Sequence, residues 1–140
     1  MLVAGGIAVN AVYGPPMPKE NKEEETTMQD ETQQVAGYQK INPDEAKRII
    51  DGNDPYVLLD VRTKEEFDTE HIPGALLLPA DDIYDEIASI KLPDKTVLIM
   101  VYCRSGGRSA EAAKTLIELG YINVYDIGGI IDWPYETIAK

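Results

Sequence analysis

The apolar run over residues 96–102 constrains the fold more than any other feature of this sequence. It has the length and composition of a strand that is buried on both faces of a parallel sheet. A second such run covers residues 57–61, and shorter extended stretches cover residues 38–41, 75–78 and 124–127. Segments with helical signals separate these stretches. The alternation predicts an α/β fold with a mostly parallel central sheet flanked by helices on both faces.

Two segments between the expected strands carry clear signals for a helix start. Asn42 is expected to cap a helix that has Pro43 at its first position and ends at Gly52. Thr63 and Glu66 have the spacing of a capping box, in which each side chain bonds the other residue's backbone N–H. The sequence therefore predicts a helix after each of these two caps.

Two more helices are expected later in the chain. Asp81 or Asp82 has the polar side chain of a helix cap, and the helix that follows is expected to run to about Ile90. The most strongly marked helix begins near Ser109 and has apolar residues at helical spacing on one face. Gly120 is expected to end it.

The first part of the chain differs in composition from the rest. Residues 1–14 form an apolar leader that suits the central region of a signal peptide but lacks its basic start. Residues 15–37 are expected to form a flexible acidic linker, and the folded domain is expected to cover residues 38–140. The leader leaves two localisations open, namely export from the cytoplasm and retention in it.

Charge and cysteine content exclude several classes of function. The chain has 13 basic and 25 acidic residues, and its net charge of −12 repels nucleic acid phosphates and anionic membrane surfaces. Nucleic acid is therefore not an expected partner. Cys103 is the single cysteine, which excludes an internal disulfide and a metal site made of cysteines.

Cys103 stands where the strongest strand ends and a helix begins, the place at which open parallel sheets bind ligands. The amides of Gly106 and Gly107 can turn inward there to form an anion cradle at the helix N-terminus. Arg104 and Arg108 add positive charge, which should lower the thiol pKa and bind an anionic substrate. The alternative interpretation, a buried bystander cysteine, explains neither the glycines nor the arginines.

Residues 103–109, C-R-S-G-G-R-S, resemble the active-site loop of the rhodanese family. Other motifs of the family recur in the correct order. Residues 60–67 resemble its D-V-R-x-x-x-E-[YF] signature, residues 71–75 its H-I-P-G-A turn, and residues 128–133 its G-G-x-x-x-W segment. The resemblance covers about residues 38–138.

The resemblance implies a single-domain sulfurtransferase in which Cys103 takes a sulfane sulfur from a donor such as thiosulfate and holds it as a persulfide. It implies that the donor anion is bound by Arg104, Ser105, Gly106, Gly107, Arg108 and Ser109. Because the chain has no second cysteine, the acceptor must be external: cyanide in an assay, or a small thiol or thioredoxin-like protein in a cell. No metal or other cofactor is expected, and a monomer is expected.

The same resemblance leaves two other functions open. One is a non-catalytic persulfide carrier or sensor module that uses the same loop. The other is a phosphatase or arsenate reductase, which is disfavoured because four residues separate Cys103 from Arg108, whereas those relatives have five and a wider loop. Outside the loop, Asp60 and Arg62 are expected to form an internal ion pair, and His71 to bond neighbouring backbone.

Overall fold

Five parallel strands form the sheet, in the order β2-β6-β5-β3-β4. The computed structural model describes residues 37–140, so the predicted leader and nearly all of the predicted linker lie outside the described residues. The strands are β2 (Gln39–Lys40), β3 (Tyr56–Asp60), β4 (Leu76–Leu77), β5 (Leu98–Cys103) and β6 (Val124–Gly129).

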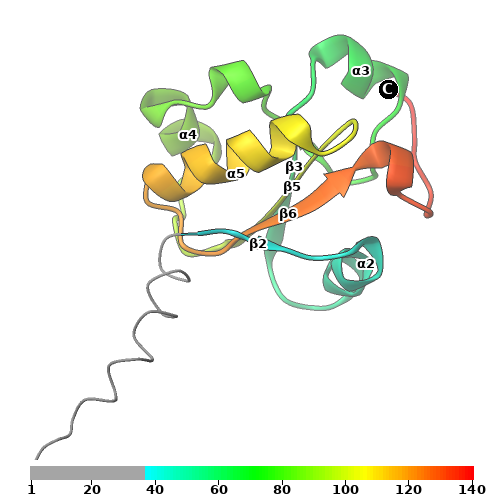
Figure 1. Ribbon diagram of the computed structural model, residues 1–140, viewed down its shortest axis with the longest axis horizontal. Coiled ribbons are helices and arrows are strands. Elements are labelled where there is room, and N and C mark those ends of the chain that lie inside the picture. The colour runs from blue at the N-terminus through cyan, green and yellow to red at the C-terminus, as the bar shows by residue number, and fades with distance from the viewer. Residues whose placement is uncertain (1–36) are drawn as a thin grey trace, which may run out of the picture. The chain divides into compact units, whose positions relative to one another are not determined.

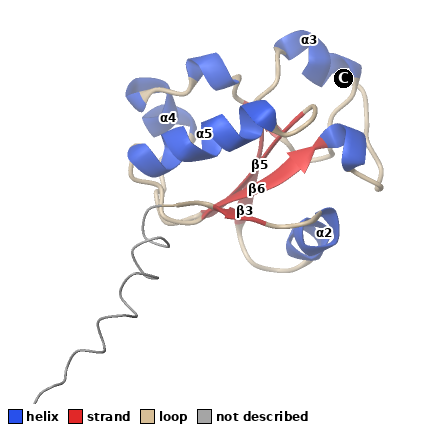
Figure 2. Ribbon diagram, in the orientation of Figure 1, coloured by secondary structure: helices blue, strands red, loops and turns tan. Residues whose placement is uncertain are grey.

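Helices cover both faces of this sheet (Figure 1). They are α2 (Pro43–Asp51), α3 (Lys64–Thr69), α4 (Asp85–Lys91) and α5 (Gly107–Glu118), with the 3-10 turns η2 (Ala80–Asp82) and η3 (Ile130–Asp132). Figure 2 shows α2 on one side of the strands, with α4 and α5 on the other. The predicted α/β architecture is thereby confirmed. Within residues 37–140, no helix combines the length and apolarity needed to cross a bilayer.

Strand β5 lies at the centre of the sheet and contributes side chains to the two hydrophobic cores, one on each face of the sheet. Alternate side chains of a strand point to opposite faces. Ile99, Val101 and Cys103 accordingly join the core beneath α4 and α5, whereas Met100 and Tyr102 join the core beneath α2. The side chain of Cys103 therefore lies on the α5 side, at the carboxyl end of the strand.

The helix caps predicted at Asn42 and Thr63, and the helix end predicted at Gly120, are present. The Asn42 side chain accepts the N–H of the third residue of α2 at 2.8 Å, and Glu45 returns the bond. Thr63 and Glu66 form the same reciprocal box at α3. At the end of α5 the Gly120 N–H donates to the last turn of the helix at 3.0 Å. These caps satisfy helix-end groups that would otherwise lack partners.

The predicted start of α4 is wrong. Asp81 and Asp82 lie in η2, and α4 begins one residue after Tyr84. The N–H of Asp82 donates to the Pro79 carbonyl at 2.8 Å, which closes a tight 3-10 turn. Ile83 then adopts an extended backbone and is buried in the core, so the chain cannot continue from that turn into the helix.

Candidate active site

Cys103 is the last residue of β5, and it is 1% exposed. The chain turns at once into a loop that leads to α5. The N–H of Gly106 points back at the sulfur and donates to it at 3.0 Å. The thiol therefore lies at the N-terminus of α5, where this amide and the helix dipole both favour negative charge.

Opposing effects act on the pKa of the Cys103 thiol. Burial is the largest, and it raises the pKa. Hydrogen bonds outweigh it and bring the pKa below its usual value; they come from the hydroxyl and N–H of Ser109, then from the N–H groups of Gly106 and Ser105. A lowered pKa supplies thiolate, the nucleophilic form of cysteine, near neutral pH.

Two glycines make this loop geometry accessible. Gly106 has φ +112°, a left-handed conformation that residues with a Cβ rarely adopt. Gly129 ends β6 beside Cys103 and faces the loop backbone; a methyl group there would overlap the Arg104 carbonyl and lie 2.6 Å from the Ser105 Cα. The conformation of the loop therefore depends on one glycine within it and one beneath it.

Arg108 joins the loop to α3. Its Nη1 and Nη2 donate to the two carboxylate oxygens of Glu66 at 2.8 and 3.1 Å. This pairing is the main reason why the pKa of Glu66 falls to about 2, with a smaller lowering by the N–H of Thr63 that works against burial. Because its guanidinium is engaged in this pair, Arg108 positions the loop in addition to adding positive charge beside the thiol.

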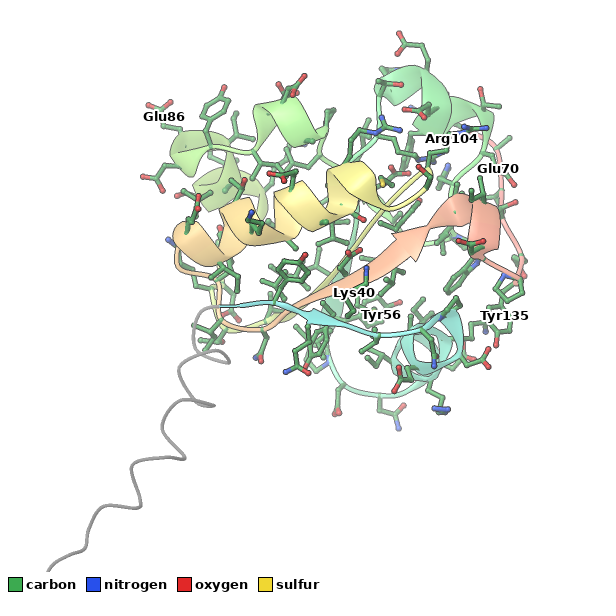
Figure 3. All side chains as sticks on the ribbon, in the orientation of Figure 1. Lys40, Tyr56, Glu70, Glu86, Arg104 and Tyr135 are labelled. Atoms are coloured by element: carbon green, nitrogen blue, oxygen red, sulfur yellow. The ribbon has the colours of Figure 1, made fainter. Side chains whose placement is uncertain are left out.

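Arg104 is exposed and lines a hollow of about 390 Å³ beside the loop. Figure 3 shows Arg104 and Glu70 at the same end of the molecule, next to α3. The hollow is lined by Arg62, Glu65, Glu66, Thr69, Glu70, Arg104, Ile130 and Ile131. The remaining loop residues, Ser105 and Gly107, are also exposed. Cys103 is not among the residues that line the hollow, so Arg104 adds an exposed positive charge beside the loop.

The expected ion pair between Asp60 and Arg62 is present and buried. Arg62 Nε and Nη2 donate to the two Asp60 oxygens at 2.9 and 2.7 Å, and Nη2 also donates to the Glu70 carbonyl at 2.6 Å. The Tyr102 hydroxyl donates to Asp60 at 2.7 Å and accepts the N–H of Ile72 at 3.0 Å. The Arg62 N–H also donates to Asp60, at 3.0 Å, so the buried carboxylate has four donors. This network joins β3, β5 and the turn after α3.

His71 has the backbone contacts expected for a structural histidine. Its Nδ1 lies 2.8 Å from the Phe67 carbonyl, and its ring stacks on the Phe67 ring with centroids 3.9 Å apart. Its backbone pairs with that of Ile138. These contacts hold the last residues of the chain against the turn after α3.

Three residues beside the loop were not identified as site residues from the sequence. Glu66 was assigned to a cap and to the D-V-R-x-x-x-E-[YF] signature, Tyr102 only to a strand, and Asp126 was not singled out. Asp126 accepts a hydrogen bond from the Ser109 hydroxyl at 2.7 Å and is fully buried. A carboxylate inside the apolar stretch at residues 124–127 is the signal that could have found it. In residues 37–140, no three metal-binding side chains of the His, Cys, Asp or Glu type cluster together.

The fold and the loop define a family. Residues 42–134 match the model of the rhodanese-like domain, and the chain belongs to this family. The thiosulfate sulfurtransferase PspE of Escherichia coli (strain K12) is 38% identical over 74 residues, which are 53% of this chain and 70% of that protein. The thiosulfate:glutathione sulfurtransferase of Saccharomyces cerevisiae is 32% identical over 116 residues, 74% of this chain and 83% of that protein.

Solved structures agree with the family assignment. A rhodanese with anions from E. coli superposes with a TM-score of 0.57 at 31% identity, covering 61% of this chain and 100% of that one. The chain spans only 22% of the adenylyltransferase and sulfurtransferase UBA4 of Meyerozyma guilliermondii, with 41% identity over 92 residues. The relatives named here are sulfurtransferases, and they include proteins of which this chain spans most of the length and one of which it spans about a fifth.

Proposed function

We propose that this chain is a thiosulfate sulfurtransferase that carries sulfur on Cys103. One observation carries the proposal: the buried sulfur accepts the Gly106 N–H at 3.0 Å inside a loop whose amides lower the thiol pKa. The same amides would stabilise the negative charge of a persulfide. The names of the relatives from E. coli and S. cerevisiae support thiosulfate as the donor.

The reaction has two displacements on sulfur. The Cys103 thiolate attacks the outer sulfur of thiosulfate; a bond forms between the two sulfurs, the sulfur–sulfur bond of thiosulfate breaks, and sulfite leaves with the electron pair. An acceptor nucleophile then attacks the terminal sulfur of the persulfide. The bond from that sulfur to Cys103 breaks, and the electron pair returns to Cys103 as thiolate.

Arg104 and the amides of the loop would bind different parts of the donor. The Arg104 guanidinium, which is exposed beside the loop, would hold the sulfonate oxygens of thiosulfate while the outer sulfur reaches Cys103. Ser105, Gly106, Gly107 and Ser109 would contribute backbone N–H groups or a hydroxyl. With four residues between Cys103 and Arg108, the loop suits one added sulfur better than a tetrahedral phosphate.

The acceptor we propose is an external thiol, with cyanide as its substitute in an assay. Cys103 is the single cysteine of the chain, so no internal thiol can receive the sulfur. The glutathione named in the S. cerevisiae relative is a small thiol of this type, and a thioredoxin-like protein would supply the same group. In this proposal the protein acts as a monomer.

The test is the formation of thiocyanate from thiosulfate and cyanide by the full chain. We expect turnover in the wild type and none in Cys103→Ser, with a mass gain of one sulfur on the wild-type protein when cyanide is left out. Arg104→Ala should raise the KM for thiosulfate without changing stability, because this side chain is exposed.

Three outcomes would contradict this function. Equal thiocyanate formation by Cys103→Ser would remove the thiol from the reaction. A stoichiometric persulfide that no acceptor discharges would instead indicate a carrier or sensor. Hydrolysis of an aryl phosphate at a rate comparable with thiosulfate turnover would indicate a phosphatase.

A further inference from the structure

The hollow of about 390 Å³ lies beside Cys103 and does not include it. Arg104, which lines the hollow, follows Cys103 directly in the chain. Ile130 also lines it and follows Gly129, the residue that pairs with Cys103 across the sheet. Consecutive Cα atoms are about 3.8 Å apart and paired strands about 4.8 Å, so both lining residues have their Cα atoms within about 9 Å of that of Cys103. A small ligand of extended shape can therefore bind in the hollow and have one end near the loop.

Two charged side chains that line the hollow already have a charged partner. Arg62 donates two hydrogen bonds to Asp60. Glu66 accepts two hydrogen bonds from Arg108. Because these charges are balanced within the protein, they contribute little to the recognition of a charged ligand.

Three other charged side chains of the hollow remain free to bind a ligand: Arg104, Glu65 and Glu70. All three are exposed, and none of them is in an ion pair with another residue in the described part of the chain. The Glu70 carboxylate is held by the Thr137 hydroxyl, which donates to its Oε2 at 2.7 Å. Arg104 and Glu70 lie at the same end of the molecule (Figure 3). The free charges are thus one cation next to the loop and two carboxylates in or just after α3.

A ligand that matches these charges carries an ammonium group for the carboxylates and a carboxylate for the arginine. Amino acids and small peptides carry both groups. The volume of the hollow is within the usual range for small-molecule sites, about 300–1,000 Å³. The side chain of Ile131, 60% exposed, adds an apolar wall against which methylene groups can pack. A cysteine within a protein chain has no such pair of terminal groups close to its thiol, so the hollow favours a peptide of few residues.

The position of the hollow beside the sulfur also favours a thiol that is remote from its own ammonium group. In an extended tripeptide thiol such as glutathione, about 10 Å separates the ammonium nitrogen from the sulfur, whereas in free cysteine the two atoms are about 3 Å apart. The longer distance is comparable with the separation between the hollow and Cys103.

We propose that Glu70 and Glu65 form a specificity site for the sulfur acceptor, which binds the ammonium group of a small peptide thiol while the carboxylate of that thiol contacts Arg104. The proposal rests on the function proposed above for Cys103 and adds the residues that select the acceptor. The acceptor thiol gives its proton to water, and its thiolate forms a bond to the terminal sulfur of the persulfide. The bond from that sulfur to Cys103 breaks, Cys103 takes the electron pair, and the acceptor leaves as a persulfide.

The test measures the second displacement by itself, on the full chain. Cys103 is loaded with sulfur from thiosulfate and, in a parallel sample, from inorganic polysulfide, and the excess donor is removed. Discharge by a thiol is then followed by intact mass as the loss of one sulfur. The two thiols compared are glutathione and N-acetylglutathione, which have the same thiol and differ in the ammonium group.

Glu70→Gln keeps the oxygen that accepts the Thr137 hydroxyl and removes the charge. We expect it to slow discharge by glutathione about threefold, and a double variant with Glu65→Gln to slow it about tenfold, without slowing discharge by N-acetylglutathione. The matched control is Glu86→Gln, which removes an exposed carboxylate of α4 on the side of the molecule away from Arg104 (Figure 3). This control should leave both rates unchanged.

Two results would overturn the proposal. Equal discharge by glutathione in the wild type and the double variant would remove the two carboxylates from acceptor binding and favour a protein thiol. Equal slowing of glutathione and N-acetylglutathione would mean that the substitutions disturb the loop and do not act on the ammonium group. A chain that accepts sulfur from polysulfide but not from thiosulfate would contradict the proposed donor, and the two thiols would still decide the acceptor site.

Discussion

Arg62 and Arg108 each hold a carboxylate with two hydrogen bonds at the same end of the sheet, but their surroundings differ. The side chains of Arg62 and Asp60 are 5% and 0% exposed. Those of Arg108 and Glu66 are 41% and 28% exposed. One pair is therefore part of the core, whereas the other is open to water beside the reactive loop.

This difference shows that hydrogen-bond geometry alone does not determine how much an ion pair contributes to the stability of the fold. Removing one partner of a buried pair leaves a charge without water or counterion, which costs far more than the pair itself is worth. An exposed pair is largely replaced by water when it is broken, so it adds little to stability. We therefore expect the buried pair to maintain the fold and the exposed pair to maintain the position of the loop.

The largest expected effect is at the buried pair. Arg62→Met should lower the free energy of unfolding by about 3 to 5 kcal/mol, because the Asp60 carboxylate loses its cation inside the core. Urea unfolding followed by circular dichroism measures the change. The same substitution at Arg108 is the matched control. Equal losses from the two variants would remove the distinction between the pairs.

The second effect concerns activity at the exposed pair. Arg108→Met should lower kcat/KM for thiosulfate by about tenfold to a hundredfold, because small displacements of a reactive group are enough to produce losses of this size. Its free energy of unfolding should change by less than about 1 kcal/mol. Thiocyanate kinetics and urea unfolding on the same sample give both values. Unchanged kinetics would show that the loop keeps its position without Glu66.

A third variant probes the buried pair without removing a charge. Tyr102→Phe deletes the hydroxyl that donates to Asp60 and accepts the Ile72 N–H. We expect a loss of about 1 to 2 kcal/mol in the free energy of unfolding, with kcat/KM nearly unchanged. Thermal unfolding and thiocyanate assays test this. A loss of activity larger than the loss of stability would mean that this network also acts on the loop.

The smallest effect is in the acid range. The pKa of Glu66 is lowered to about 2 in the folded chain, from an ordinary value of 4.5. Its contribution is therefore fully present above pH 4.5 and is lost as the pH falls toward 2. Between pH 5 and pH 3 the free energy of unfolding should fall less in Glu66→Gln than in the wild type. The difference between the two proteins should be under about 1 kcal/mol, because the pair is exposed. Identical acid dependence in the two proteins would contradict this.

Local signals in the sequence predicted the elements that hold the loop. Asn42 and Thr63 cap helices as expected, because their side chains reach only the next turn of the chain. Gly120 ends α5 for a similarly local reason. The placement of Cys103 at the end of the central strand followed from the apolar run before it. These local features were therefore predicted correctly.

The sequence did not reveal contacts between distant segments. Glu66 already had a local partner in its cap, so nothing indicated that Arg108, 42 residues later, also pairs with it. The contact between Ser109 and Asp126 depends on how α5 packs on β6, which no local pattern encodes. The cap expected at Asp81 or Asp82 failed for a related reason, since burial of Ile83 in the core decided where α4 begins.

The absence of a side chain at Gly129 has a consequence for how the protein could diversify. The loop backbone rests directly on this residue, so main-chain contacts there limit the course of the loop whatever side chains stand at Arg104 and Ser105. Arg104 and Ser105 point outward and are exposed. New donor preferences could therefore arise by exchanging those outward side chains, whereas an alanine at Gly129 would disturb every variant alike.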